Sequence, residues 1–237
     1  RGKFPSAEEL WLTPQGVEQS TSWRIAEQKA GRFGSSPVID LCSGLGNDAR
    51  ALARRGPTVA VDRSWGMCRR LVWNARVWGV SSSVLAVRAE AGSLAIPPDC
   101  LVHVDPDRRA MPGPARRART LADYQPGTQV LHHLIRGTRG GALKVGPVSD
   151  FEAVLPMEAL EVEWLSEGGE CKGAVLWWGE LRDAATEGCV TVVPAAARWV
   201  CPRQGSGGAA APWPKPADSA GSGLLGQARW IFDPDPA

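Results

Sequence analysis

The sequence predicts a three-layer α/β sandwich built around a mostly parallel sheet of seven strands. Three observations support this fold class. Short apolar runs alternate with helical periodicity over residues 37–145, a glycine-containing loop joins the first run to the next helix, and a hairpin pattern follows at 161–178. Strands that alternate with helices at this spacing form parallel βαβ units with right-handed crossovers. The antiparallel hairpin then closes the C-terminal end of this Rossmann-like sheet.

The expected elements follow in order along the chain. Apolar residues at helical spacing predict a first helix over 16–33, with Gly34 as its end. Five short apolar runs are typical of strands buried on both faces, and they occupy 37–41, 58–61, 84–87, 101–104 and 141–145. Three helices are expected between them, the last with Pro126 in its first turn, over 47–55, 65–78 and 126–136. The hairpin strands are 161–165 and 172–178, and 230–233 is a candidate last strand.

Length and composition suit one large α/β domain with a small addition. Hydrophobic residues make up 43% of the 237 and charged residues 22%, which is ordinary for a globular protein. No stretch approaches the ~18 consecutive apolar residues of a membrane helix. We expect an N-terminal helical segment over 1–36, a ligand-binding domain over 37–180, and C-terminal strands over 181–237 that include an insertion rich in Gly, Ala and Pro at 203–226.

The ends and the cysteines indicate a fragment of a cytoplasmic protein. Arg1 opens a segment with neither an initiating Met nor the apolar core of a signal peptide. The six cysteines show no CxxC pair and no regular spacing, so neither a zinc site nor a disulfide framework is expected. We expect reduced cysteines that pack as small hydrophobes, and no metal. The net charge of +2 favours no class of partner, and the oligomeric state stays open.

The loop from Asp40 to Gly46 is the first candidate site. It follows an expected strand and opens an expected helix, which is the context of a glycine-rich cofactor loop. Gly44 and Gly46 lack a Cβ, so the backbone can turn tightly and let a ligand approach its amides. Ligands of doubly wound sheets bind beyond the carboxyl ends of the strands, where this loop is expected to lie.

Two carboxylates favour S-adenosylmethionine over a dinucleotide as the ligand. Asp62 ends the second expected strand and can accept both hydroxyls of an adenosine ribose. Asp40 precedes the loop, where a negative charge repels a pyrophosphate but attracts the ammonium of a methionine moiety. The loop also departs from the dinucleotide pattern G-x-G-x-x-G/A, because Asp48 and Ala49 follow Gly46. The alternative is a simple glycine turn between two solvated acids.

Four further residues complete the expected cofactor set. Glu90 follows the third expected strand and is a candidate for the adenine edge, although an exposed loop acid explains it equally well. The remaining candidates are neighbours of the loop and of Asp62: Cys42, Asn47 and Arg63.

Several segments together resemble one family. They are Glu18–Ser22, the Asp40–Asp48 loop, Asp105–Arg109, Lys144–Asp150, Glu170–Lys172 and Asp233–Pro236. In this order they resemble bacterial class I S-adenosylmethionine-dependent methyltransferases with a THUMP-like C-terminal domain. The resemblance covers most of the chain except the insertion, and it implies that residues 181–237 include the start of a truncated THUMP-like domain. Because THUMP-type modules accompany RNA modification, it also implies an rRNA or tRNA acceptor.

The segment Asp105-Pro106-Asp107-Arg108 is the candidate transfer site. It follows the fourth expected strand, where amino-group methyltransferases carry [Asn/Asp/Ser]-Pro-Pro-[aromatic]. Asp107 and Arg108 depart from that motif, which puts simple adenine N6 chemistry in doubt, although an Arg plane can also stack on a base. The resemblance adds four substrate-binding candidates, which are Gln19, Thr21, Arg109 and Lys144. No cysteine lies beside this motif in the sequence, so covalent catalysis on a pyrimidine is not expected.

Other basic and histidine residues are less informative. Five arginines (108, 109, 116, 117 and 119) form a segment that either tracks phosphates or is a solvated loop. His103 lies in an apolar run and is interpreted as a packed core residue, and no acid–base role is evident for His132 and His133. The alternatives to an RNA methyltransferase are an enzyme that methylates a small molecule or a protein, and a non-catalytic scaffold that binds S-adenosylmethionine.

Overall fold

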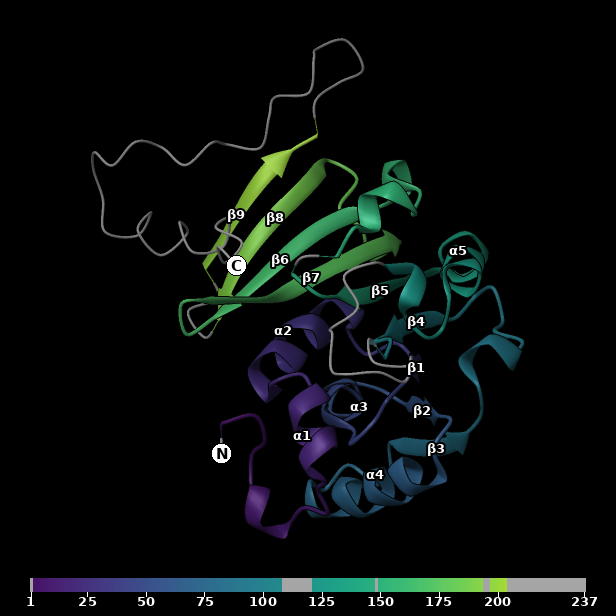
Figure 1. The fold of residues 1–237 in the computed structure, drawn as a ribbon, viewed down its shortest axis with the longest axis vertical. Coiled ribbons are helices and arrows are strands. Elements are labelled where there is room, and N and C mark those ends of the chain that lie inside the picture. Colours follow the sequence, from purple (N-terminus) through teal and green to yellow (C-terminus); the bar gives the residue numbers. More distant parts are fainter. Residues whose placement is uncertain (1, 108–120, 148, 194–196, 204–237) are drawn as a thin grey trace.

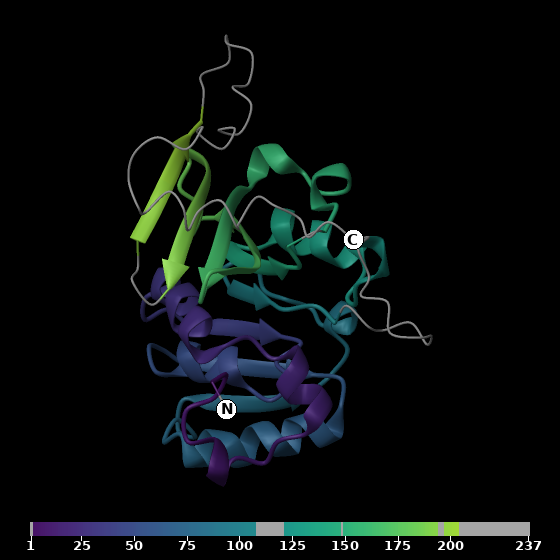
Figure 2. The same cartoon turned by 60° about the vertical axis from the view of Figure 1, so that its left-hand side comes forward.

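The structure, a computed structural model, describes residues 2–107, 121–147, 149–193 and 197–203. Its described part contains one sheet of nine strands in the order β3-β2-β1-β4-β5-β7-β6-β8-β9 (Figure 1). The strands are β1 (Val38–Leu41), β2 (Thr58–Asp62), β3 (Val84–Arg88), β4 (Leu101–Val104), β5 (Gly140–Val145), β6 (Glu161–Glu167), β7 (Glu170–Gly179), β8 (Thr186–Val193) and β9 (Ala197–Pro202). Figure 2 shows them as a twisted succession from β3 at one end to β9 at the other.

The first five strands confirm the predicted parallel βαβ arrangement. β1 pairs in parallel with both β2 and β4, β2 pairs with β3, and β4 pairs with β5. All four positions of β4 are buried, as the apolar run at 101–104 requires.

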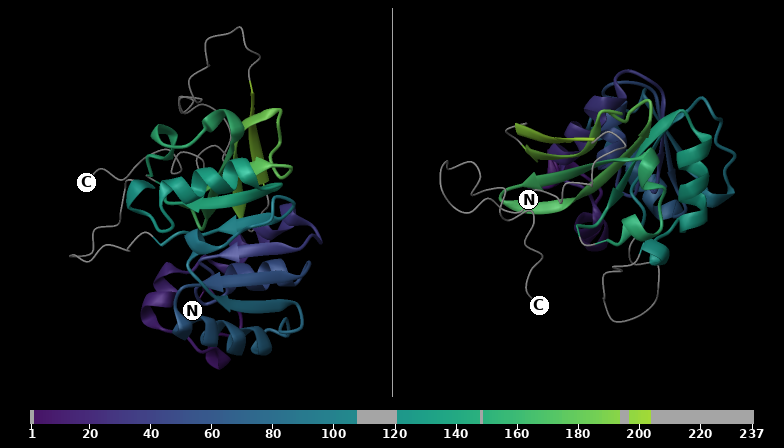
Figure 3. Two further views of the ribbon diagram at one scale, coloured as in Figure 1. Left: turned by 90° about the vertical axis from the view of Figure 1, so that its right-hand side faces the viewer. Right: turned by 90° about the horizontal axis from the view of Figure 1, so that it is seen from above.

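Helices lie on both faces of this sheet, which confirms the three layers. The helices are α1 (Pro14–Gln19), α2 (Trp23–Phe33), α3 (Asn47–Ala53), α4 (Trp65–Val77) and α5 (Thr128–Gly137). Short 3₁₀ turns join them, namely η1 (Ala7–Glu9), η2 (Ala91–Ser93), η3 (Leu121–Asp123), η4 (Phe151–Ala153) and η5 (Met157–Ala159). In Figure 3 the sheet separates α5 from the purple N-terminal helices.

Two apolar clusters hold the layers together, one on each face. On one face Leu131 and Leu134 of α5 pack with Leu41 and Val104 of the sheet. On the other, α2 and α3 pack against the alternate strand positions, for example Phe33 against Val38 and Leu101. Burial of this apolar area on both faces is the main driving force for the fold.

The C-terminal part of the sheet corrects the expected seven strands to nine. β7 runs antiparallel to both β5 and β6, which confirms the hairpin, with Gly168 and Gly169 at its turn. β8 then pairs in parallel with β6, and β9 pairs antiparallel with β8. The sheet is therefore mixed. β6 is the first predicted hairpin strand, and β8 and β9 are the two additional strands. Buried positions of β6 and β8 include Glu161, Glu163, Thr191 and Cys189.

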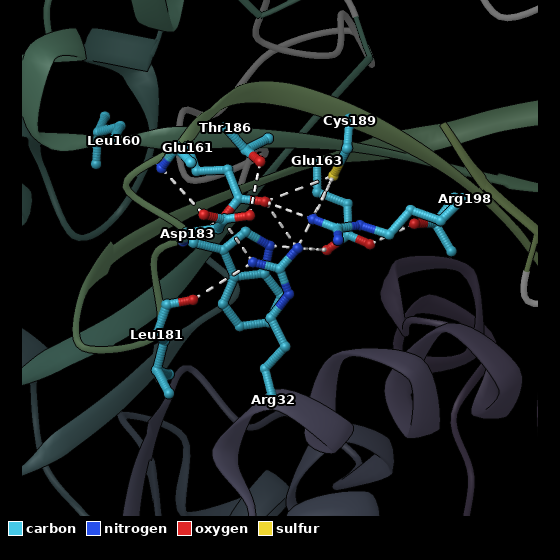
Figure 4. A network of polar contacts seen from close by, with 12 residues as sticks. Arg32, Leu160, Glu161, Glu163, Leu181, Asp183, Thr186, Cys189 and Arg198 are labelled. Carbon is cyan, nitrogen blue, oxygen red and sulfur yellow. Dashed lines mark hydrogen bonds and ion pairs between the residues drawn. The ribbon is translucent and has the colours of Figure 1, made fainter. Parts of the chain in front are cut away.

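A buried ion-pair network attaches this extension to α2. Arg32 donates two hydrogen bonds to the Glu161 carboxylate, at 2.7 and 2.8 Å, and Arg198 of β9 donates a third at 3.0 Å. Glu161 is fully buried, and Glu163 accepts from Thr191 and from the Trp177 indole (Figure 4). Burial would raise the pKa of Glu161, but the Arg32 hydrogen bonds outweigh it and the pKa lies below its usual value.

Two helix predictions are corrected in detail. The helix expected over 16–33 is two helices, because Ser20–Ser22 is extended and Ser22 caps α2 by accepting from the Ile25 amide. Pro126 lies before α5 rather than in its first turn, since Gly127 is the N-cap. The candidate strand 230–233 and residues 204–226 of the insertion lie outside the described residues. No helix in the described ranges is long and apolar enough to cross a membrane.

Candidate functional site

A cleft of about 630 Å³ opens at the carboxyl ends of β1, β2 and β4. The loop after β1 forms its floor, and residues of α1 and the turn after it line the opposite wall. Three more segments complete the lining: the start of α4, the turn after β3, and residues 125–127 before α5. This is the position that ligands occupy in doubly wound sheets.

The glycine loop leaves space for a ligand at one of its two glycines. Gly44 has a φ of +53°, and a Cβ built on it would meet nothing within 4 Å. Gly46 has a φ of +93°, but its Cβ would lie 2.9 Å from Leu71 of α4, and it does not line the cleft. Gly44 is therefore the position where a ligand can approach, whereas Gly46 allows close packing of the loop on α4.

Asp62 is held beside this loop by two backbone amides. Its Oδ2 accepts from Gly44 N at 2.9 Å, and its Oδ1 accepts from Ser64 N at 2.8 Å. The carboxylate lines the cleft and each oxygen retains further lone pairs. It can therefore accept hydroxyl groups of a ligand while it fixes the loop.

Asp40 is buried and is held from one side only. His103 Nδ1 lies 2.7 Å from Asp40 Oδ1, and His103 Nε2 lies 2.8 Å from the Lys29 ammonium. Because the ammonium can only donate, Nε2 accepts and Nδ1 carries the proton donated to Asp40. Asp40 Oδ2 is buried and has no hydrogen-bond partner among the described residues. Burial raises the pKa of Asp40, against the lowering effect of the His103 hydrogen bond.

Lys29 links the Asp40–His103 pair to a second buried carboxylate, Asp48. Its Nζ lies 2.8 Å from Asp48 Oδ1. Burial alone would raise the pKa of Asp48, but the Lys29 charge, assisted by that of Lys144, holds it below its usual range. Asp40, Asp48 and Asp105 thus share two ammonium groups, those of Lys29 and Lys144. The cleft floor carries an excess negative charge that a cationic ligand would balance.

Asp105 follows β4, and its backbone amide donates to the Leu41 carbonyl at the end of β1. Its Oδ2 accepts from Thr21 Oγ1 at 3.0 Å and from Lys144 Nζ at 2.9 Å. Burial opposes ionisation, but Lys144 and Lys29 outweigh it and lower the pKa of Asp105. Asp105 is therefore a carboxylate suited to accept a hydrogen bond from a substrate N–H or O–H, and a weak base.

Asp107 is the second carboxylate of the expected transfer site. Gln19 Nε2 donates to its Oδ1 at 3.2 Å, and Arg63 lies 3.3 Å from its Oδ2. Its backbone exchanges two hydrogen bonds with Gln125, which joins the segment after β4 to the segment before α5. The four candidates from distant parts of the sequence, Gln19, Arg63, Thr21 and Lys144, therefore all contact this carboxylate pair.

Cys42, one of the expected cofactor residues, lines the cleft close to these carboxylates. It has a φ of +63° and its thiol points toward the Gln125 carbonyl. Burial raises the pKa of the Cys42 thiol, and the charges of Asp62 and Asp105 raise it further. The thiol stays protonated, which does not favour a nucleophilic role.

The other candidates take varied positions. Glu90 lines the cleft next to η2 and is exposed, whereas Lys144 lies behind Asp105 and is not a lining residue. Asn47 lines the cleft, but its amide donates to the carbonyls of Lys3 and Thr21. Pro106 lines the cleft beside Asp105. Arg108, Arg109 and the arginines at 116, 117 and 119 lie outside the described residues.

Some lining segments were missed by the sequence analysis. Gln15, Gly16 and Ser20 form part of the wall, as do Gly92 and Gly127. Their signal was weak: a single helix was expected through 16–33, and neither turn carries a charged group that points to a ligand. The Thr13 N-cap and Pro14, a pair that typically begins a helix, could have indicated the separate α1.

All six cysteines are free, and no group of three or more His, Cys, Asp or Glu within the described ranges is arranged to hold a metal ion.

Comparison with known proteins identifies the fold. No family model matches the chain. Two curated relatives come from Mycobacterium tuberculosis, strains CDC 1551 and H37Rv, and each is named an uncharacterised S-adenosylmethionine-dependent methyltransferase. Both are 31% identical to this chain over 170 residues. The match covers 70% of this chain and 46% of each relative. The chain thus spans about half the length of these relatives. A crystal structure from Porphyromonas gingivalis W83, assigned as a methyltransferase, has a TM-score of 0.58 at 15% identity and covers 81% of this chain and 51% of that one. The described residues therefore adopt the fold of class I S-adenosylmethionine-dependent methyltransferases.

Proposed function

We propose that this chain binds S-adenosylmethionine in the cleft and transfers its methyl group to an acceptor held by Asp105 and Asp107. The observation that carries the proposal is the buried Asp40 Oδ2, which has no partner among the described residues and lies in a cleft lined by many more acids than bases. The name of the Mycobacterium tuberculosis relatives supports the same cofactor.

The residues of the cleft fit each part of this cofactor. Asp40 would accept from the ammonium of the methionine moiety, and Asp62 would accept from the ribose hydroxyls. The backbone of Gly44 leaves the space through which the ligand passes close to the loop. Glu90, beside η2, is the candidate for the adenine edge.

The chain's contribution to transfer is orientation and exclusion of water. When bound, S-adenosylmethionine would supply a methyl group carried on a sulfonium. A nucleophile attacks the methyl carbon directly, and S-adenosylhomocysteine is the leaving group. Asp105, held by Thr21 and Lys144, would accept a hydrogen bond from the acceptor and so direct its lone pair. Asp107 would provide a second contact, fixed by Gln19.

We propose RNA as the acceptor. The support is the family resemblance, together with a carboxylate pair that can accept hydrogen bonds from a base amino group. The expected phosphate-tracking arginines lie outside the described residues, so they remain a prediction. The THUMP-like C-terminal domain and the cytoplasmic location also remain predictions.

Two measurements on the full-length protein test the proposal. Calorimetry should show binding of S-adenosylmethionine and S-adenosylhomocysteine but not of NAD, with Asp40→Asn at least about tenfold weaker because it removes a charge-assisted contact. Label from methyl-tritiated S-adenosylmethionine should then enter total RNA from a strain that lacks the gene.

Each other outcome favours a named alternative. Equal affinity for NAD would overturn the cofactor assignment. Label in protein or in small molecules, with none in RNA, would replace RNA as the acceptor. Cofactor binding without transfer to any fraction would indicate a scaffold instead of an enzyme.

A further inference from the structure

The outer face of α4 combines aromatic and basic side chains in an unusual way. Between Asp62 and Glu90 the chain has no Asp or Glu, yet it contains five arginines and three tryptophans. A solvated helix of a globular protein normally carries charges of both signs. This segment therefore has a surface of one sign, interleaved with aromatic rings.

The helix displays these residues in alternation. Trp65, Arg69 and Trp73 follow one another at intervals of four residues, so they lie on one face of α4 about 6 Å apart along its axis. Trp65 is 61% exposed and Trp73 is 51% exposed, whereas most large hydrophobic side chains of the described part are buried. Arg69 and Arg76 are also exposed and form no ion pair with a described residue.

The N-terminal segment adds a third indole to this face. Trp11 N donates to Asn74 Oδ1 at 2.8 Å, which fixes the segment on α4. The guanidinium carbons of Arg69 and Arg70 lie 5.4 and 4.9 Å from the centroid of the Trp11 ring, and this ring is 39% exposed. Such cation–π contacts hold the ring and the charges together. The exposed acids of the same segment are Glu8 and Glu9, against five arginines.

The start of α4 borders the cleft, because Arg63, Ser64 and Met67 line it and Trp65 belongs to the same turn of the helix. Figure 1 shows α4 at the β3 end of the molecule, far from β8 and β9. A chain-like ligand that enters the cleft can therefore extend along α4.

We propose that Trp65, Arg69, Trp73, Arg76 and Trp11 form a docking surface for single-stranded RNA. Exposed indoles provide faces on which bases stack, and arginines without acidic partners pair with phosphates. In a duplex the bases are already stacked on each other, so the tryptophans select a single strand. The choice of RNA rests on the proposed function, in which RNA is the acceptor.

The two kinds of side chain make different, measurable contributions. The probe is a fluorescein-labelled, mixed-sequence single-stranded RNA of about 20 nucleotides, titrated with the full-length protein at several salt concentrations without cofactor. Trp65→Ala and Trp73→Ala should each weaken binding by about fivefold or more, with the salt slope unchanged. Arg69→Gln and Arg76→Gln should each reduce the slope of log K against log salt by about 0.7.

Controls come from the opposite end of the molecule. Trp199, 40% exposed on β9, and Arg136, exposed on α5, are matched in type and exposure. Trp199→Ala and Arg136→Gln should leave both affinity and slope unchanged. Trp73→Phe should retain most of the affinity, because it keeps a ring. Thermal unfolding of the Trp65, Arg69 and Arg76 variants should match that of the wild type, since these side chains are exposed. The Trp73 variants also lose the hydrogen bond from Trp73 Nε1 to the Glu9 carbonyl, so Trp65→Ala is the variant that tests stacking alone.

The outcomes separate this surface from the proposed function. RNA binding that is equally strong in all α4 variants would overturn the proposed docking surface and leave the assignment of RNA as the acceptor intact. Equal loss in the β9 and α5 controls, or tighter binding of duplex RNA or of single-stranded DNA, would also overturn it. Loss of RNA affinity confined to the α4 variants supports the surface even if the protein fails to bind S-adenosylmethionine.

Discussion

His103 Nδ1 lies 2.7 Å from Asp40 Oδ1, and both side chains are only 1% exposed. The pairing of β1 with β4 sets Asp40 directly opposite His103, so the two side chains point to the same face of the sheet. The packed histidine expected from the sequence is therefore also a positioning residue. It holds Oδ1 of Asp40 and leaves Oδ2 without a partner among the described residues.

The first prediction concerns the Lys29 ammonium, which contacts His103 on the side opposite Asp40. Lys29 is 2% exposed and contacts both His103 and Asp48. Lys29→Met should lower the free energy of unfolding by about 3–5 kcal/mol, because it leaves Asp48 charged and buried without its partner. Urea unfolding monitored by circular dichroism measures the change.

A second variant isolates the pair. Adding Asp48→Asn to Lys29→Met removes the uncompensated charge, so part of the lost stability should return as a favourable coupling energy. Strict additivity of the two changes would show that the ion pair does not explain the cost.

The parallel half of the fold was predictable because its signal is local. A short apolar run identifies each strand there without knowledge of its neighbours, although β3, at the edge of the sheet, is only partly buried and Leu85 is 62% exposed. β8 and β9, the two strands beyond the predicted hairpin, were not assigned bounds from the sequence. Glu161 and Glu163 read as exposed positions, and only Arg32, more than a hundred residues earlier, makes their burial possible. The two extra strands depend on this long-range pairing.

The same distinction applies to the site. The loop after β1 and the acid that ends β2 could be located from the sequence because they occupy fixed places in a βαβ unit. That Cys42 lies beside Asp105, and that Asn47 is committed to the N-terminal segment, follows from tertiary contacts alone. Gly44 and Gly46 look equivalent in sequence, but only Gly44 lines the cleft.

The second prediction uses this difference between glycines. Gly44→Val should abolish S-adenosylmethionine binding, because its side chain would project into the open space at the loop. Gly79 is the control: its φ is +69° and a Cβ there also meets nothing within 4 Å, but it lies outside the cleft. Gly79→Val should cost similar stability from left-handed strain, about 1–2 kcal/mol, with normal binding by calorimetry. Equal binding by both variants would exclude this loop as the cofactor site.

The third prediction concerns Asp62. Asp62→Ala should weaken S-adenosylmethionine binding by about 1.5–3 kcal/mol, the range for hydrogen bonds to a charged group. It should also loosen the loop, because Gly44 N and Ser64 N lose their acceptor. Asp62→Asn keeps one oxygen and should recover part of the affinity. A loss of only a few tenths of a kcal/mol in the Ala variant would place the ribose elsewhere.

The fourth prediction is a pH dependence at the buried end of the sheet. Because the pKa of Glu161 is lowered in the folded state, its stabilising contribution is complete above the unfolded value of about 4.3 and is lost as the pH falls through the folded value. Glu161→Gln should therefore cost about 3 kcal/mol at pH 7 and progressively less below pH 4. Urea midpoints between pH 7 and pH 3 measure this. The exposed Glu187→Gln should show no such convergence, and a cost for Glu161→Gln that is constant with pH would contradict the assignment.

The last prediction separates donor binding from transfer. The side chain of Asp105 accepts hydrogen bonds from two other residues of the chain, Thr21 and Lys144, and the proposed donor contacts are made by Asp40 and Asp62, so Asp105→Ala should leave the affinity for S-adenosylmethionine within a few-fold of the wild type. Transfer should fall by about 10²-fold or more, because the acceptor loses the contact that orients it. Asp105→Asn retains a carbonyl oxygen and should recover part of kcat. Thr21→Val removes one hydrogen bond to Asp105 without removing the carboxylate, and should reduce kcat less than Asp105→Ala does. The measurement is methyl transfer to total RNA by the full-length protein, with calorimetry on the same samples. A fully active Asp105→Ala enzyme would show that the segment after β4 is a structural turn, and the acceptor would then have to contact Asp107 or residues outside the described ranges.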